Sequence, residues 1–140
     1  VGDGYEKSKL LDLINKYDLS NYIKILPFNP NPYNLIKNCK LFVLPSIYEG
    51  YSNSLIQSIS LKVNLLISKA PGGNKEIMGK YYDFYSFNFL KKFNSKSFMK
   101  KIKDILSNDN YDKKNYLFKR IKIRHSSHNT LSKYLFCLDE

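Results

Sequence analysis

The sequence predicts one α/β domain in which helices flank a parallel sheet. Short apolar runs at residues 41–44 and 65–67 alternate with longer segments whose apolar residues recur at helical spacing, and this alternation is typical of βαβ units. With 140 residues, 43% of them hydrophobic, the chain is long enough to bury a core. No internal repeat or low-complexity linker is present, so we expect a single domain over residues 1–140.

The first forty residues predict two helices and one strand. Leucines and isoleucines at helical spacing predict a helix over residues 6–17. The run 22–26 is read as a strand that Pro27 would end. A segment rich in turn-forming residues follows, and a short helix is expected over 33–38.

The stretch LFVLPSIYEGYSNSLIQS, residues 41–58, is the most informative part of the chain. Its first four residues are long enough for a buried strand and too short for most helices. A polar turn with Glu49 and Gly50 follows, and Ser52-Asn53-Ser54 can cap the start of an amphipathic helix. Strands that lead through a glycine-bearing turn into a helix are where α/β proteins place ligands, and the free N–H groups of helix starts bind anions.

Beyond that helix the hydrophobic pattern predicts five further elements. They are a strand at 65–67, a short helix beginning near Glu76, an edge strand within 81–89, an amphipathic helix over 98–106, and a helical region over 113–138 with a break near 125–129. The segment between the first two is a loop that contains Pro71, Gly72 and Gly73.

The chain carries a formal net charge of +11, which is unevenly distributed. Residues 1–70 hold eight lysines against five acidic residues, a net of +3, whereas residues 71–140 hold fifteen Lys and Arg against seven acidic residues, a net of +8. A basic surplus favours anionic partners: phosphorylated ligands, acidic lipid or nucleic acid. The abundance of Lys, Asn, Ile and Tyr is also typical of AT-rich bacterial genomes, so the lysines at 91–103 and 113–124 are interpreted first as solvated helix faces.

Cysteine and histidine do not indicate a metal or redox centre. Cys39 and Cys137 have no metal or redox spacing, and free buried thiols in a reducing cytosol are expected. His125 and His128 can share a helix face, but no carboxylate or cysteine accompanies them, so no metal site is expected there. No apolar run is long enough to span a membrane, and no signal peptide is recognisable.

An ordered set of motifs resembles a known family. GDG at 2–4, KILPF at 24–28, PSIYEGYSNSLIQS at 45–58 and APGGNKEI at 70–77 occur in this order. Together they resemble the C-terminal nucleotide-sugar-binding domain of family-four glycosyltransferases of the GT-B fold, over residues 1 to about 80 and more loosely over 118–138. The resemblance implies a Rossmann-like parallel sheet, the second half of such a C-terminal domain, ending in C-terminal helices.

The resemblance also implies an activity. Members of this family are retaining transferases that use a nucleoside-diphosphate sugar and need no metal or other cofactor. The acceptor, a glycan or a lipid-linked glycan of a bacterial surface polysaccharide, would bind through an N-terminal domain that is absent from this chain. The expected location is cytoplasmic, with peripheral contact to the anionic inner face of the membrane as one option, and no nucleic acid is expected as partner.

The motif positions imply a donor site. By resemblance, Glu49 is the catalytic-site carboxylate that accepts hydrogen bonds from the donor sugar near its reacting carbon. The backbone N–H groups of Gly50, Tyr51, Ser52 and Asn53 would face the sugar and the diphosphate, and the base would lie against Pro27 and Phe28. Fixed amides at a helix start stabilise the charge that develops on a leaving diphosphate, and a carboxylate is a strong acceptor for sugar hydroxyls.

The chain departs from the family pattern at two positions of the donor site. Ser52 replaces the second Gly of the commoner Glu-Gly-Phe-Gly version, a change that the neighbouring Asn53 makes tolerable. The second Glu of the family's Glu-x7-Glu pattern, which binds the ribose hydroxyls, is replaced by Gln57. An amide oxygen can still accept a hydrogen bond without the charge, so weaker donor binding is expected. Gly72, Gly73 and Glu76 either contact the donor or form a turn with a first-turn Glu that the helix dipole favours.

Two alternatives to an active donor domain stay open. The start Val1-Gly2-Asp3-Gly4 reads like the end of a strand, so the chain resembles the later part of a longer protein. The family's basic pair that neutralises the diphosphate lies upstream of this turn, so this chain alone is expected to be inactive. A truncated, non-catalytic remnant is therefore one alternative, and a basic module for nucleic acid or anionic membrane is the other.

Overall fold

The computed structural model describes residues 2–89, 93–108 and 110–125. The chain divides into two compact units, Val1–Asn34 and Leu35–Glu140, and each is treated separately below. The expectation of a single domain stays a prediction.

The first unit is built on one helix, α1 (Lys7–Lys16), which confirms the helix expected over 6–17. The chain leaves this helix at Asp18, whose φ of 51° lies in the left-handed region. Apolar side chains of α1 and of the segment after it, including Leu13, Tyr17 and Ile23, line a hollow of about 320 Å³.

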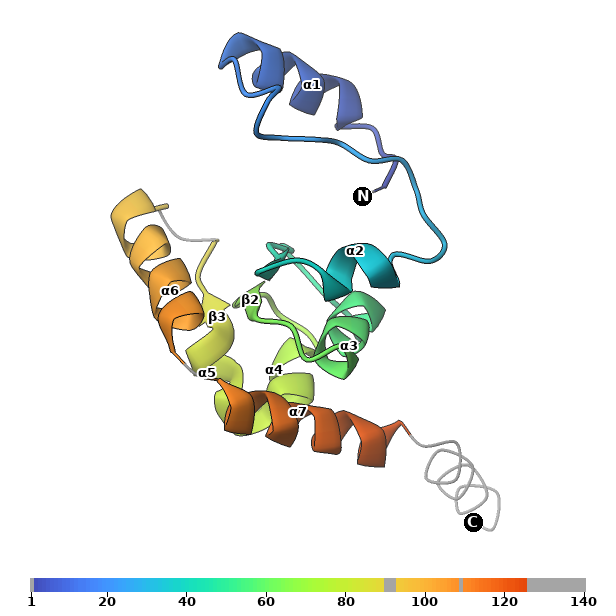
Figure 1. Ribbon diagram of the computed structural model, residues 1–140, viewed down its shortest axis with the longest axis vertical. Coiled ribbons are helices and arrows are strands. Elements are labelled where there is room, and N and C mark those ends of the chain that lie inside the picture. Colours follow the sequence, from blue (N-terminus) through green and yellow to red (C-terminus); the bar gives the residue numbers. More distant parts are fainter. Residues whose placement is uncertain (1, 90–92, 109, 126–140) are drawn as a thin grey trace. The chain divides into compact units, whose positions relative to one another are not determined.

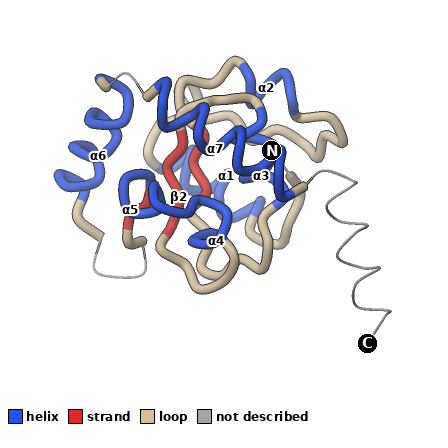
Figure 2. The backbone as a smooth tube through the Cα atoms, turned by 90° about the horizontal axis from the view of Figure 1, so that it is seen from below, coloured by secondary structure: helices blue, strands red, loops and turns tan. Residues whose placement is uncertain are grey.

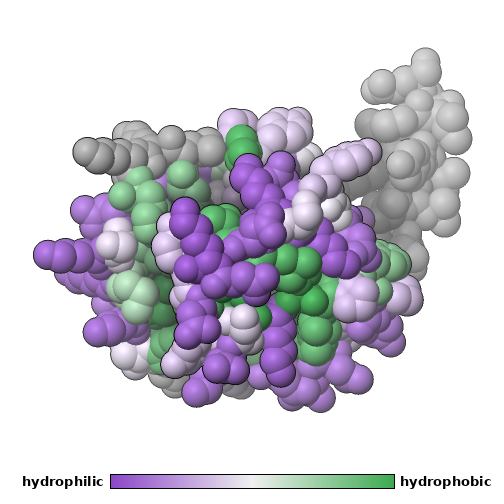
Figure 3. Space-filling model, turned by 90° about the horizontal axis from the view of Figure 1, so that it is seen from above, coloured by the Kyte–Doolittle hydropathy of each residue, from purple (hydrophilic) through white to green (hydrophobic). Residues whose placement is uncertain are grey.

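Large apolar side chains are exposed in both units. Figure 3 shows apolar groups between hydrophilic ones on the face that it presents.

The strand predicted at residues 22–26 is wrong. These residues are described, and they form no strand. Ile23 instead closes a turn by donating its backbone N–H to the carbonyl of Leu19 (2.9 Å), and the backbone carbonyl of Leu26 accepts one hydrogen bond from the N–H of Gly2 (3.0 Å). An apolar run becomes a strand only where a neighbouring strand offers a ladder, and within the described part of this unit none does.

The second unit contains a parallel sheet, as the sequence predicted, and this sheet has three strands within the described residues. Its strands are β1 (Phe42–Leu44), β2 (Leu65–Ser68) and β3 (Ser86–Phe87), in the order β1-β2-β3. β1 pairs with β2 through Val43 and Leu66, and β2 pairs with β3 through Ile67 and Ser86. Figures 1 and 2 agree in placing helix α6 on the β3 side of the sheet and α3 on the other side of β2.

Among the described residues, seven helical segments lie at or beyond the boundary between the units. They are α2 (Tyr33–Lys37), α3 (Asn53–Ser60), α4 (Asn74–Met78), the 3-10 helix η1 (Gly79–Tyr81), α5 (Tyr82–Tyr85), α6 (Ser95–Ser107) and α7 (Tyr111–Arg124). The helices expected over 33–38, from 53 onward, near 76 and over 98–106 are confirmed. The last predicted helix is confirmed as far as Arg124, and its part beyond residue 125 lies outside the described residues.

The short edge strand that was predicted within 81–89, together with its loop, is confirmed in part. Only Ser86–Phe87 pairs as a strand, and the preceding aromatic residues are helical. Gly79, at a φ of 56°, turns the chain out of α4 and lets η1 and α5 follow at once. This places the ring of Tyr85 fully inside the core, which a flat edge strand would leave half-exposed.

β2 is the centre of the core. Its residues Leu65, Leu66 and Ile67 are at most 1% exposed, because strands lie on both sides of it and helices cover its faces. The helices contribute a continuous cluster of fully or almost fully buried side chains, which includes Leu55, Ile59, Ile77, Met78, Tyr85, Ile105, Leu117 and Ile121. β1 is less buried than predicted: Val43 is 39% exposed, because within the described residues only β2 pairs with this strand.

Cys39 is a free thiol, as expected, although it is half-buried. Burial raises the pKa of the Cys39 thiol above its usual value. Cys137 lies outside the described residues. Among the helices of the described ranges, none combines the length and apolarity that crossing a membrane requires.

We predict that the stability of the second unit depends on β2 and much less on β1. Leu66→Ala removes a fully buried side chain and should lower the free energy of unfolding by about 2–5 kcal/mol. Val43→Ala, at the paired position on β1, should lower it by less than about 1 kcal/mol, because partly exposed sites are tolerant. Urea denaturation monitored by circular dichroism measures both values. Equal losses would contradict this account of the core.

Candidate functional site

The turn after β1 and the loop after β2 are joined backbone to backbone. Glu49 pairs with Gly72 as an isolated parallel bridge, and the N–H of Glu49 donates to the carbonyl of Pro71 (3.2 Å). The N–H of Gly73 donates to the carbonyls of Gly50 (2.6 Å) and Glu49 (3.2 Å). The two most specific motifs of the sequence, more than twenty residues apart, therefore form one structure at the carboxyl edge of the sheet.

The two glycines of the second loop are required by this contact. Gly72 has a φ of 117°, and a Cβ atom there would lie 1.5 Å from the carbonyl oxygen of Glu49. A Cβ on Gly73 would lie 2.4 Å from the carbonyl oxygen of Gly50. Gly50 itself faces open space. The close packing of two backbones thus accounts for Gly72 and Gly73, and their contact with a donor stays a prediction.

The Glu49 side chain is held in place from the ends of both strands. Its Oε1 atom accepts a hydrogen bond from the Ser46 hydroxyl (2.6 Å), and the side chain is half-buried. The carbonyl of Ser46 in turn accepts from the hydroxyl of Ser68, the last residue of β2 (2.5 Å). A carboxylate fixed in this way is ready to accept hydrogen bonds from a hydroxylated ligand.

Helix α3 begins directly after this turn. Ser52 is its N-cap, and its hydroxyl accepts from the N–H of Leu55 (3.4 Å) and contacts the hydroxyl of Ser54 (3.1 Å). Asn53 is exposed at the first position, and Gln57 is half-buried one turn later. Residues 53 and 57 share a face because they are four residues apart on a helix. The structure thus brings Glu49 to Asn53 together and places Gln57 on the helix that follows, as the sequence predicted.

Sequence reasoning missed the part that α7 plays. The hydroxyl of Tyr51 lies 3.1 Å from Nε2 of His125, with ring centroids 5.4 Å apart. Arg124 forms an ion pair with Glu76 (2.6 Å), and Arg120 donates to the backbone carbonyls of Glu76 (2.8 Å) and Ile77 (3.2 Å). The end of α7 and the residue after it therefore contact the turn at Tyr51 and helix α4. The signal in the sequence was only two arginines four residues apart, which does not reveal their partners.

Asn74 is a second residue that the sequence analysis did not single out. It follows the glycine pair, is fully buried, and its side-chain amide has no hydrogen-bond partner among the described residues. The only signal was a polar residue directly after Pro-Gly-Gly, and such a residue is usually read as an exposed loop position.

Two of the predicted site residues belong to the first unit. Pro27 and Phe28 are exposed in the first unit, where the N–H of Phe28 donates to the Asp3 carboxylate (3.1 Å), so their contact with a base stays a prediction. Lys7 and that same N–H lower the pKa of Asp3. In the ranges that the structure covers, no three metal-ligating side chains gather, and His128 lies outside them.

Comparison with known proteins finds a family model described as glycosyl transferases group 1, which matches residues 1–122. The chain is 36% identical over 78 residues to an uncharacterized glycosyltransferase of Methanocaldococcus jannaschii, covering 56% of this chain and 19% of the relative. It is 33% identical over 79 residues to the N-acetylgalactosamine-N,N'-diacetylbacillosaminyl-diphospho-undecaprenol 4-alpha-N-acetylgalactosaminyltransferase of Campylobacter jejuni, covering 56% and 22%. An O-antigen biosynthesis glycosyltransferase of Escherichia coli is 27% identical over 71 residues, covering 51% and 20%.

The chain therefore belongs to the glycosyl transferases group 1 family. The resemblance stated from the motifs is confirmed, and so is the α/β class with its parallel, Rossmann-like sheet. The chain spans about a fifth of the length of these curated relatives.

We predict that Gly72→Ala separates the two loops. The new Cβ would overlap the Glu49 carbonyl, and overpacking with a residue forced to positive φ should cost about 2–4 kcal/mol of unfolding free energy. Gly50→Ala is the matched control for stability, because its Cβ would enter open space, and it should change stability by less than about 1 kcal/mol. Urea denaturation compares the two. Similar small losses would show that the backbone contact does not determine the turn.

Proposed function

We propose that this chain forms the donor-binding part of a retaining glycosyltransferase and binds a nucleoside-diphosphate sugar at the turn Glu49–Asn53. The observation that carries the proposal is the locking of the Glu49-Gly50 turn onto Gly72 and Gly73 at the carboxyl edge of the parallel sheet. This edge is where open α/β sheets bind ligands. The capped start of α3 follows directly.

The proposed chemistry follows from these groups. The Glu49 carboxylate, oriented by Ser46, accepts hydrogen bonds from hydroxyls of the donor sugar. The N–H groups of Gly50 to Asn53, at the start of α3, face the diphosphate and stabilise the negative charge that grows on it as the sugar leaves. Gln57 takes the place of the ribose-binding carboxylate and supplies an uncharged acceptor.

The proposed acceptor is a glycan linked to a lipid. The name of the Campylobacter relative specifies a diphospho-undecaprenol acceptor, and that of the Escherichia relative specifies O-antigen biosynthesis. An acceptor of this kind would bind through a further domain of the whole protein and would place the enzyme at the cytoplasmic face of the membrane. The chain matches only about a fifth of those relatives, so the acceptor belongs to the proposal.

We predict that nucleoside-diphosphate sugars stabilise this chain through Glu49. In a thermal-shift panel of UDP-, GDP- and ADP-sugars at millimolar concentration, at least one should raise Tm, because a ligand that binds only the folded state stabilises it. Glu49→Ala should abolish the extra shift that the sugar gives over the matching nucleoside diphosphate. Glu6→Ala, the same change at the exposed residue that precedes α1, should leave that difference intact. No shift with any donor would sink the proposal.

We predict that Gln57→Glu tightens donor binding. A carboxylate forms a stronger hydrogen bond with ribose hydroxyls than an amide does, and a gain of about 1 kcal/mol corresponds to roughly a fivefold lower Kd. Ser60→Glu adds the same charge at an exposed position on the same helix and should not improve binding. Isothermal titration with the donor identified in the panel measures both. Equal effects of the two variants would contradict a ribose contact at this position.

A further inference from the structure

An open cavity lies at the carboxyl edge of the sheet, on the other side of β2 from the Glu49 turn. It has a volume of about 510 Å³ and is formed where β2 and β3 end beside α6. Lys69, directly after β2, and Lys100 and Lys101, on α6, contribute its basic side chains. Lys69 also donates its backbone N–H to the carbonyl of Phe87 (2.9 Å), which ties the ends of the two strands together.

The cavity lining holds three lysines and two carboxylates, Asp83 and Asp104, so the lysines exceed the acidic side chains by one. Lys69 pairs with Asp83 (2.7 Å), and Lys101 donates to the backbone carbonyl of the same residue (3.2 Å). The side chain of Asp83 is 81% exposed, so this pair is screened by water and contributes little. Burial, followed by the charge of Lys69, lowers the pKa of Lys101. Two ammonium groups thus lie close enough to repel, and a bound anion would offset that repulsion.

A buried hydroxyl adds a second, independent indication. Ser86 lines the cavity at the beginning of β3, is 4% exposed, and its Oγ atom has no hydrogen-bond partner among the described residues. Leaving a buried polar group unpaired costs about 1–3 kcal/mol, so such groups usually have a reason to be retained. A hydroxyl donor beside lysines suits an anionic oxygen.

We propose that this cavity binds a phosphate or diphosphate group, at a site distinct from the Glu49 turn. Lys69, Lys100 and Lys101 supply the charge, and the Ser86 hydroxyl supplies a neutral donor. The site shares the carboxyl edge of the sheet with the turn, because Lys69 begins the loop that leads to Gly72. Two sources carry this chemistry: the nucleoside diphosphate that a transfer reaction releases, and the diphosphate of a lipid-linked acceptor.

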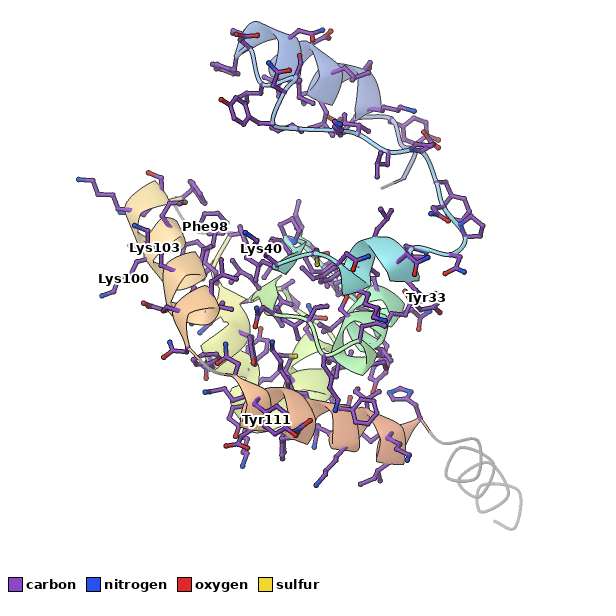
Figure 4. The ribbon with its side chains drawn as sticks, viewed as in Figure 1. Tyr33, Lys40, Phe98, Lys100, Lys103 and Tyr111 are labelled. Atoms are coloured by element: carbon purple, nitrogen blue, oxygen red, sulfur yellow. The ribbon has the colours of Figure 1, made fainter. Side chains whose placement is uncertain are left out.

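Binding of inorganic diphosphate to the 140-residue chain, measured by isothermal titration near physiological ionic strength, tests the site. The double variant Lys100→Gln/Lys101→Gln should raise Kd by roughly tenfold or more, since each lost charged hydrogen bond is worth a factor of several. Lys103→Gln is the control, because Lys103 lies on the same helix (Figure 4) and is not among the residues that line the cavity. It should change Kd by less than twofold. Ser86→Ala, which leaves the charge of the cavity unchanged, should weaken diphosphate binding severalfold.

The outcomes are distinct. Absence of binding to the unaltered chain, unchanged binding in the double variant, or an equal loss in the Lys103 variant would overturn the proposal. The donor turn is tested separately by the shift in Tm that the sugar adds, so failure at the donor turn and failure at this cavity can be told apart. UDP and geranyl diphosphate then distinguish the two sources. The cavity binds the compound whose affinity for the chain falls in the double variant.

Discussion

The close approach of two backbone segments is the constraint on which the candidate site depends. The turn after β1 and the loop after β2 touch without side chains between them, and a single Cβ on Gly72 would lie 1.5 Å from the Glu49 carbonyl. Interiors are packed too tightly to absorb such an overlap. The position of the Glu49 carboxylate, and of the helix start that follows it, is therefore set by the absence of side chains twenty residues later in the chain.

α7 supports this contact from a distance in the sequence. Its ion pair between Arg124 and Glu76 joins side chains that are 36% and 60% exposed, so it contributes less than about 1 kcal/mol. Arg120 adds two hydrogen bonds to carbonyls at the end of α4, of which the one to Ile77 is partly buried and the one to Glu76 is exposed. Arg120 is half-buried and also packs over Gly79, so it fixes α7 against the loop. The hydrogen bond between Tyr51 and His125 then joins the end of α7 to the turn after β1.

The sequence predicted those elements whose pattern is local. The strands near 41–44 and 65–67 and the capped helix at Ser52 follow from apolar runs and capping residues, and the structure has them. The strand at 22–26 failed because strand formation needs a partner that a local pattern cannot reveal. The aromatic run 81–85 became helical because Gly79 and the burial of Tyr85 decide its course. Likewise, the partners of Arg120 and Arg124 depend on tertiary packing, which spacing alone does not encode.

The structure shows where some of the basic side chains gather. Residues 71–140 carry a net charge of +8. Lysines that only solvate a helix face need not converge on one place. Lys69, from the nearly neutral half, converges instead with Lys100 and Lys101 where β2 and β3 end. Parallel strands bring their carboxyl ends to one edge, and β2 has a loop there that serves both sides: Lys69 toward the cavity, and Gly72 and Gly73 toward Glu49. A change in this one loop is therefore able to alter the cavity and the Glu49 turn together.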